Sequence, residues 1–171
     1  MMTTLAQTKL PRRQCLVAFA AGSAALLPLP GMAAPRRVLF DRAAYDRYVR
    51  FMNASDPKVV DFYADDIKFV MNIRGKAEVS NFYARQRPYV RETLDVLFFC
   101  SDATGAAAEV HSKLRCIKDC DDTTIFGRPL KAGEVQRTHG FLLYVLNDRG
   151  LIAEIKAPPP EILQPWRIEA A

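Results

Sequence analysis

Two kinds of hydrophobic spacing divide this chain. Between residues 41 and 87, apolar side chains recur at three- and four-residue steps, the spacing of amphipathic helices. From residue 94 to residue 157, long segments rich in β-branched and aromatic residues are separated by turn residues, which is typical of β-strands. Helices followed by a run of strands predict an α+β fold with an antiparallel sheet, because parallel sheets need alternating strands and helices.

Three helices are predicted in the first half of the chain. The first follows Asp41 and ends near Asn53, and the second begins at Pro57 behind the capping residue Asp56. A strand is predicted over residues 67–72. The third helix covers residues 76–87 and ends before Pro88, because the residue before a proline disfavours the helical conformation.

Four strands are predicted in the second half. They cover residues 94–100, 106–117, 135–146 and 151–157. Residues 147–150 (NDRG) form a tight hairpin turn, and residues 119–133 form the loop between the middle strands. Three prolines at 158–160 end the predicted domain, and we expect Trp166 in the tail that follows to fold back over apolar surface.

The N-terminal segment has the order of a signal peptide. Lys9, Arg12 and Arg13 precede an apolar run over residues 16–29, and small residues follow at 31–34. The pair Arg12 and Arg13 favours the twin-arginine export route. A membrane anchor is disfavoured because the run is shorter than the roughly 20 apolar residues that span a bilayer. We therefore expect a signal peptide over residues 1–34 and a periplasmic or secreted protein with no membrane span after processing.

Charge and length narrow the function classes for the remainder. Removing residues 1–34 leaves 21 Lys and Arg against 19 Asp and Glu, so the net charge falls from +5 to +2. The basic residues are interspersed with acids, which argues against nucleic-acid binding. The remaining 137 residues suffice for one domain, predicted over residues 35–157, with a proline-rich tail over 158–171.

Cysteine and histidine give no metal signature. Cys116 and Cys120 are close enough in sequence to close a small disulfide loop, which would leave Cys100 as a buried thiol. A zinc site would need further ligands, but there is no second Cys pair, and His111 and His139 stand apart from each other. We predict neither a metal nor a cofactor.

Residues 47–56 (RYVRFMNASD), 62–66 (FYADD) and 81–84 (NFYA) are the most distinctive segments. Together with the element order, they resemble the nuclear transport factor 2-like superfamily, which includes SnoaL-like polyketide cyclases and Δ5-3-ketosteroid isomerases. The resemblance covers nearly all of the chain after residue 34. It implies a cone-shaped fold in which three N-terminal helices pack on a strongly bent sheet and leave an apolar pocket.

The resemblance also assigns residues to that pocket. Tyr48 matches the tyrosine that donates a hydrogen bond to the substrate oxyanion of ketosteroid isomerases. The isomerase's base falls at Met71 and its protonated aspartate near Leu142, so both carboxyl groups are missing. The resemblance implies a pocket lined by Tyr48, Met71 and Leu142 that binds a small apolar molecule. If the strand with Phe141 and Leu143 is apolar on its outer face as well, either the partner subunit of a homodimer, as is usual in the family, or the Trp166 tail would cover it.

A base would have to come from elsewhere. His139 is the candidate that we pair with Tyr48 as catalytic, whereas strand alternation places His111 on the outer face of the sheet. Asp65 and Asp66 are interpreted as a turn feature.

Two functions therefore stay open. One is an isomerase, dehydratase or cyclase that acts on a carbonyl compound. The other is a non-catalytic module for ligand binding or dimerisation.

Overall fold

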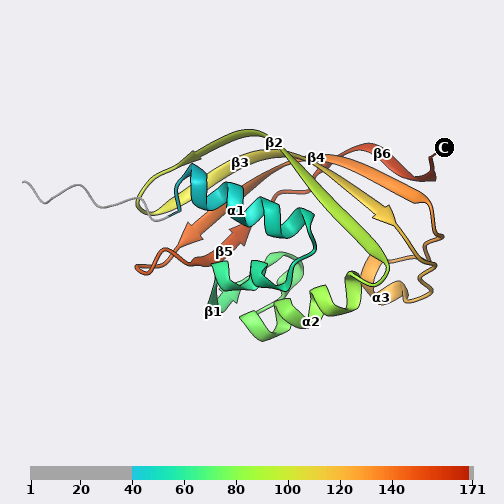
Figure 1. Cartoon of the computed structure of the whole chain (residues 1–171), viewed down its shortest axis with the longest axis horizontal. Coiled ribbons are helices and arrows are strands. Elements are labelled where there is room, and N and C mark those ends of the chain that lie inside the picture. Colours follow the sequence, from blue (N-terminus) through green and yellow to red (C-terminus); the bar gives the residue numbers. More distant parts are fainter. Residues whose placement is uncertain (1–39, 170–171) are drawn as a thin grey trace, which may run out of the picture. The chain divides into compact units, whose positions relative to one another are not determined.

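The computed structural model describes residues 40–169, so the signal peptide predicted over residues 1–34 lies outside the described residues. The elements before the long strands are α1 (Arg42–Asn53), the 3₁₀ helix η1 (Pro57–Phe62), β1 (Tyr63–Lys68), the 3₁₀ turn η2 (Val70–Asn72) and α2 (Lys76–Gln86). The later elements are β2 (Val90–Ser101), β3 (Gly105–Cys116), α3 (Thr123–Phe126), β4 (Glu134–Leu146), β5 (Ile152–Lys156) and β6 (Glu161–Ile168) (Figure 1). No helix within residues 40–169 is long and apolar enough to cross a membrane.

The α+β prediction is confirmed, but the sheet is mixed and not fully antiparallel. Its strand order is β1-β5-β4-β3-β2, with β6 paired to β4 beside this path. The pairs β2–β3, β3–β4 and β4–β5 are antiparallel, whereas β1 pairs with β5 in parallel. The long chain between β1 and β5 permits either direction, and the sequence pattern carries no information about that distant pairing.

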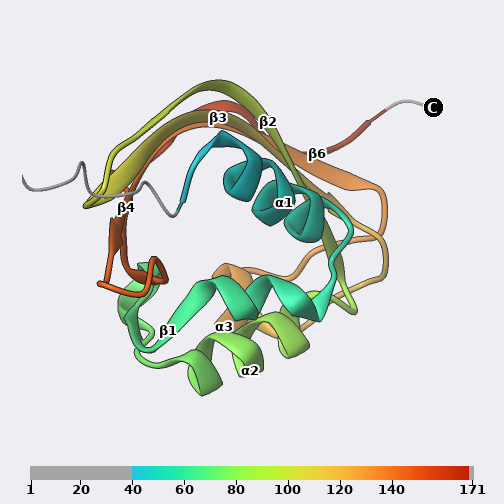
Figure 2. The ribbon, with the colours of Figure 1, turned by 60° about the vertical axis from the view of Figure 1, so that its left-hand side comes forward.

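Helix α1 forms where the spacing predicts it. The Asp41 carboxylate accepts a hydrogen bond from the Ala44 amide at 2.9 Å, which caps the helix, and Tyr45, Tyr48 and Met52 are buried on one face. At its end the Asn53 side chain bonds both the amide and the carbonyl of Leu94, at 2.7 and 3.0 Å. This side chain fixes α1 against β2. Figure 2 shows β2, β3 and β4 curving over α1, with α2 on the other side of the helix.

The strand predicted over residues 67–72 is misplaced. Strand β1 ends at Lys68, and η2 follows, with Met71 and Asn72 in the left-handed region at φ of 57° and 60°. The chain reverses here because the Phe69 amide bonds the Ile73 carbonyl at 2.9 Å. Three predicted N-terminal helices are thus two α-helices and two 3₁₀ segments.

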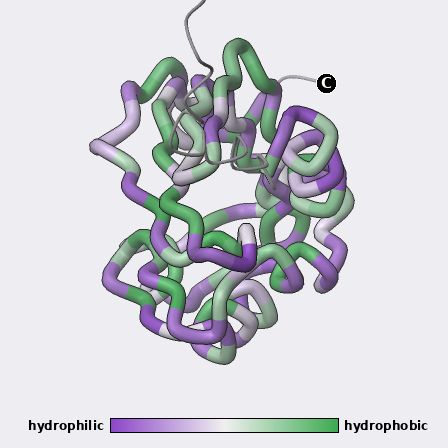
Figure 3. Tube along the Cα trace, turned by 90° about the vertical axis from the view of Figure 1, so that its left-hand side faces the viewer, coloured by the Kyte–Doolittle hydropathy of each residue, from purple (hydrophilic) through white to green (hydrophobic). Residues whose placement is uncertain are grey.

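The long strands alternate between an inner and an outer face. Ala106, Ala108 and Val110 of β3 are buried toward α1, and hydrophobic and hydrophilic residues are interspersed along the trace (Figure 3). The outer face also carries exposed apolar side chains, with Phe141 55% and Leu143 45% accessible. Within residues 40–169 nothing buries these two side chains.

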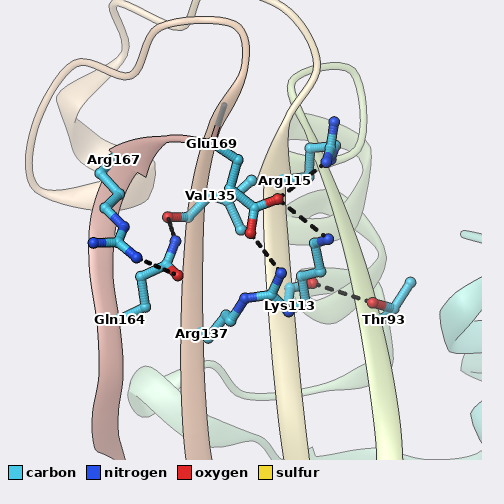
Figure 4. Close-up of polar contacts among 8 residues, drawn as sticks. All are labelled: Thr93, Lys113, Arg115, Val135, Arg137, Gln164, Arg167 and Glu169. Atoms are coloured by element: carbon cyan, nitrogen blue, oxygen red, sulfur yellow. Dashed lines mark hydrogen bonds and ion pairs between the residues drawn. The ribbon is translucent and has the colours of Figure 1, made fainter. Parts of the chain in front are cut away.

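The tail predicted over residues 158–171 contributes a strand to the sheet. Strand β6 pairs with the first half of β4, which would otherwise be an edge, and Gln164 donates to the Val135 carbonyl at 3.3 Å. Beyond β6, the Glu169 carboxylate bonds Arg115 and Arg137 and lies 3.5 Å from the Lys113 ammonium (Figure 4). The prolines at 158–160 lie between β5 and β6.

A second hydrophobic cluster lies under the loop between β3 and β4. It consists of Val90, Cys116, Cys120 and Leu130, and Phe126 and Trp166 pack against it with ring centroids 6.0 Å apart. Trp166 thus folds back over apolar surface as expected. Cys100, Cys116 and Cys120 are all free thiols, so the structure has no Cys116–Cys120 disulfide, and Cys100 is exposed and not buried as predicted.

Candidate ligand pocket

A cavity of about 280 Å³ lies between the helices and the inner face of the sheet. Most of its wall is apolar. Its lining comprises Tyr48, Met52, Phe69, Val70, Met71, Phe82, Tyr83, Gln86, Glu92, Leu94, Leu114, Ile125, Phe126, Leu142, Tyr144 and Ile155. The structure therefore brings the three residues expected at the pocket, Tyr48, Met71 and Leu142, to one cavity. This concave apolar site with a few convergent polar groups has the character of a small-molecule site.

Three tyrosines form a hydrogen-bonded chain beside the cavity. The Tyr48 hydroxyl is 3.0 Å from that of Tyr63, which is 3.3 Å from that of Tyr83. The Tyr83 hydroxyl can also donate to the Met52 sulfur at 3.5 Å. Burial raises the pKa of Tyr48 and of Tyr63 well above the usual value, so both hydroxyls keep their protons at neutral pH.

The chain has two directions, and one of them leaves a donor at the cavity. Each hydroxyl has a single proton, so Tyr63 donates either to Tyr83 or to Tyr48. When Tyr83 donates to Tyr63 and Tyr63 donates to Tyr48, the Tyr48 proton is free for a ligand oxygen. Hydrogen bonds in such a chain polarise one another, which makes the terminal donor stronger.

Tyr144 is a further tyrosine that lines the cavity. Its side chain is fully buried, and its hydroxyl has no hydrogen-bond partner among the described residues. The Tyr45 hydroxyl also has no hydrogen-bond partner among the described residues. The hydroxyls of Tyr45 and Tyr144 are close enough that each affects the pKa of the other. An unbonded buried hydroxyl costs free energy, so both hydroxyls destabilise the folded protein.

Glu92 is the pocket residue that sequence reasoning missed. It lies on β2, and its partial exposure is exposure to the cavity that it lines. Burial raises the pKa of the Glu92 carboxyl, while a hydrogen bond from the Ser112 hydroxyl, at 3.2 Å, opposes the rise. The described lining contains no Lys, Arg or His, so no cation stabilises the carboxylate from within the cavity.

A signal for Glu92 exists in the sequence. Val90, Leu94 and Val96 alternate on the inner face of β2, and Glu92 is the charged member of that series. The strand predicted from the sequence begins at residue 94 and therefore excludes Glu92, whereas β2 begins at Val90.

Met71 and Leu142 supply no proton-transfer group. Met71 is 61% accessible at the rim of the cavity, and Leu142 lies on the inner face of β4. A thioether and an isobutyl group neither take up nor release a proton, so these two residues shape the cavity and do not act on a proton.

The structure does not bring His139 to Tyr48. In β4, Leu142 and Tyr144 face the cavity, so the odd-numbered His139 faces outward. There its Nε2 lies 2.8 Å from Glu109 and its Nδ1 3.4 Å from Glu161. The bond to Glu109, with smaller help from Glu161, raises the pKa of His139. His139 is thus part of an outer-face ion-pair group, which also corrects its assignment as the partner of Tyr48.

The remaining candidates are also outside the cavity. His111 lies on the outer face, as alternation predicts, with its ring centroid 5.4 Å from that of His139. Asp65 and Asp66 are exposed residues of β1 and not of a turn. Among residues 40–169, no three His, Cys, Asp or Glu side chains are grouped so that they could hold a metal ion.

Comparisons with known proteins identify the fold. No family model and no curated protein matches the chain. A candidate polyketide cyclase from Silicibacter sp. TM1040 is 26% identical, with a TM-score of 0.57 over 68% of this chain and 85% of its own. A candidate polyketide cyclase from Xanthomonas campestris pv. campestris is 21% identical, with a TM-score of 0.56 over 67% of this chain and 86% of its own.

The Δ5-3-ketosteroid isomerase of a Mycobacterium species is 21% identical, with a TM-score of 0.52 over 68% of this chain and 89% of its own. The chain therefore has the nuclear transport factor 2-like fold of SnoaL-like cyclases and ketosteroid isomerases, as the sequence resemblance predicts.

Proposed function

We propose that this chain is an exported protein whose pocket binds a small apolar molecule that carries a carbonyl group. The observation that carries the proposal is the apolar cavity of about 280 Å³ whose polar groups include the end of a tyrosine hydroxyl chain. The Tyr48 hydroxyl can donate a hydrogen bond to a carbonyl oxygen, and neither group changes its charge.

The charge of the lining supports a neutral ligand. With Glu92 as the acidic group and no basic group in the described lining, a ligand carboxylate or phosphate would be buried without a counter-charge. Burying such an ion costs several kcal/mol, which is about the whole binding free energy of a small ligand. Neutral carbonyl compounds avoid this cost.

Structural neighbours include candidate polyketide cyclases and a ketosteroid isomerase, which supports an isomerase, dehydratase or cyclase. Loss of both family carboxyl groups, at Met71 and Leu142, favours the second candidate, a non-catalytic binding module. Native mass spectrometry of the exported protein tests the shared claim, because a co-purifying neutral molecule of matching size is expected. The same spectrum reports whether the chain is the homodimer that we propose for the exposed outer face.

Tyr48→Phe should weaken binding of a cyclic ketone by about 0.5–1.5 kcal/mol, the usual net value of one neutral hydrogen bond. Binding of the matching cyclic hydrocarbon should hardly change, because the ring of Tyr48 is retained. Calorimetric titration of both ligands into both proteins measures the difference. Equal losses for ketone and hydrocarbon would make Tyr48 a packing residue and remove the basis for a carbonyl ligand.

The proposal of export by the twin-arginine route is based on residues 9–34, where basic residues, an apolar run and small residues follow one another in that order. Replacing Arg12 and Arg13 together with Lys should leave the full-length precursor in the cytoplasm, and fractionation with immunoblotting measures this. Normal secretion of the double variant would exclude the twin-arginine route. Cytoplasmic retention of the wild-type protein would exclude export altogether.

A further inference from the structure

A second hollow adjoins the ligand cavity and is lined largely by polar and charged residues. It has a volume of about 380 Å³ and shares with the cavity wall the residues Phe69, Val70, Met71 and Ile155. Its other lining residues are Lys68, Asn72, Arg74, Glu154, Lys156, Ala157 and Pro158. A ligand that enters the cavity past Met71 therefore crosses a surface unlike the apolar wall inside.

Three cations lie around this opening, and we call Lys68, Arg74 and Lys156 the cationic rim. Lys68 ends β1 and is directly opposite Arg74 in an antiparallel bridge. Both are exposed, and neither side chain has a hydrogen bond or an ion pair within residues 40–169. Lys156 lies on the neighbouring strand β5, 3.9 Å from Glu154, which is the acid of the described rim lining. Since like charges at opposite positions repel, an external anion at the rim would stabilise the fold.

An apolar side chain lies among these charges. Met71 is 61% accessible and belongs to the turn that joins Lys68 to Arg74. Its φ of 57° is left-handed, a conformation that glycine or asparagine adopts at less cost than methionine. The turn itself therefore gives no reason for a large exposed apolar residue. Cations beside an exposed apolar side chain are typical of protein surfaces that bind phospholipid bilayers, where the cations contact head groups and the apolar group enters the lipid.

We propose that the cationic rim and Met71 dock the protein on an anionic phospholipid bilayer, with the mouth of the ligand cavity toward the lipid. This inference rests on the proposed function, the binding of a small apolar molecule by an exported protein. Such a molecule partitions from water into lipid. A cavity whose mouth lies on the bilayer receives the molecule directly from the lipid.

The exposure of the three cations favours a bilayer over an anionic end of the ligand itself. No hydrogen bond within residues 40–169 orients the Lys68 ammonium or the Arg74 guanidinium, so the rim is not a preorganised site for one carboxylate or phosphate. Attraction to a charged bilayer requires no such geometry, because it depends on the number of cations within a Debye length of the surface.

Flotation of vesicles tests the proposal. The exported protein should bind vesicles of phosphatidylcholine and phosphatidylglycerol mixed two to one, and bind vesicles of phosphatidylcholine alone far more weakly. Lys68→Gln together with Arg74→Gln should weaken binding to the mixed vesicles about 25-fold, because each cation near an anionic surface contributes about fivefold. The same double variant should bind a cyclic ketone in solution as the wild type does, because the cavity wall is unchanged.

Arg47→Gln together with Lys58→Gln is the matched control. Both residues are exposed, on α1 and η1, and they line neither hollow, so the control loses the same two charges at another place. Its binding to the mixed vesicles should stay within threefold of the wild type. Thermal melts establish that both double variants are folded.

The outcomes separate docking from the proposed function. Equal weakening in the two double variants would show that net charge alone attracts the protein, and would overturn the docking surface. A wild-type protein that does not bind the mixed vesicles would also overturn it, while ketone binding in solution would leave the pocket function intact. If the Lys68 and Arg74 variant instead loses affinity for decanoate and keeps its affinity for vesicles, the rim holds an anionic end of the ligand and docking is wrong. Failure of the ketone to bind would contradict the proposed function, whatever the vesicles show.

Discussion

Leu130→Ala should lower the free energy of unfolding by about 2–5 kcal/mol, the usual cost of truncating a fully buried leucine. Leu130 is 0% accessible in the second hydrophobic cluster, where it contacts the strand ends that carry Val90 and Cys116. The cost has two parts, the lost transfer of the side chain from water and the cavity that remains. Urea denaturation of the purified domain measures the change.

Leu163→Ala is the matched control for this prediction. Leu163 lies on β6 and is 49% accessible, so the same chemical change should alter stability by no more than about 0.5 kcal/mol. The loop that carries Leu130 also carries Ile125 and Phe126, which line the ligand cavity. Leu130→Ala should therefore weaken ligand binding as well. Similar losses for the two variants would contradict the burial argument.

The elements that sequence predicted well are those with local causes. Helix α1 has its cap at Asp41 and its apolar face within 12 residues, and α2 ends before Pro88. Strand β6 had no such signal, because it is stabilised by β4, more than 20 residues earlier, and by the bonds that Glu169 makes to Arg115 and Arg137. The parallel pairing of β1 with β5 was missed for the same reason.

The residues of the candidate site also differ in whether the sequence could predict them. Tyr48 is predicted because the resemblance is most specific in α1, and Met71 and Leu142 follow from it by counting forward from residues 64–66 and back from Asn147. Glu92 depends on where β2 begins and on which face its alternation points. The bonds from Tyr63 to Tyr48 and Tyr83 connect α1, β1 and α2, and no spacing in the sequence indicates that three hydroxyls meet.

Tyr63→Phe should destabilise the protein by about 1–3 kcal/mol, although it removes a single oxygen atom. Tyr63 is fully buried and its hydroxyl is the middle of the chain, so its loss leaves Tyr48 without its hydroxyl partner and leaves Tyr83 with the weak acceptor Met52. Ketone binding should weaken too, because Tyr48 is no longer polarised by a neighbouring donor.

Tyr144→Phe is the comparison that isolates the hydrogen bonds from the burial. Tyr144 is as buried as Tyr63, but its hydroxyl has no partner among residues 40–169. Removing that hydroxyl should leave the stability of the ligand-free protein unchanged or slightly higher, since a desolvation cost disappears and only a poorly aligned contact with the Tyr45 hydroxyl is lost. Urea denaturation of both variants, each without ligand, gives the comparison. Equal destabilisation would show that the loss at Tyr63 reflects packing around the ring, and the hydroxyl chain would then have no part in holding Tyr48 toward the cavity.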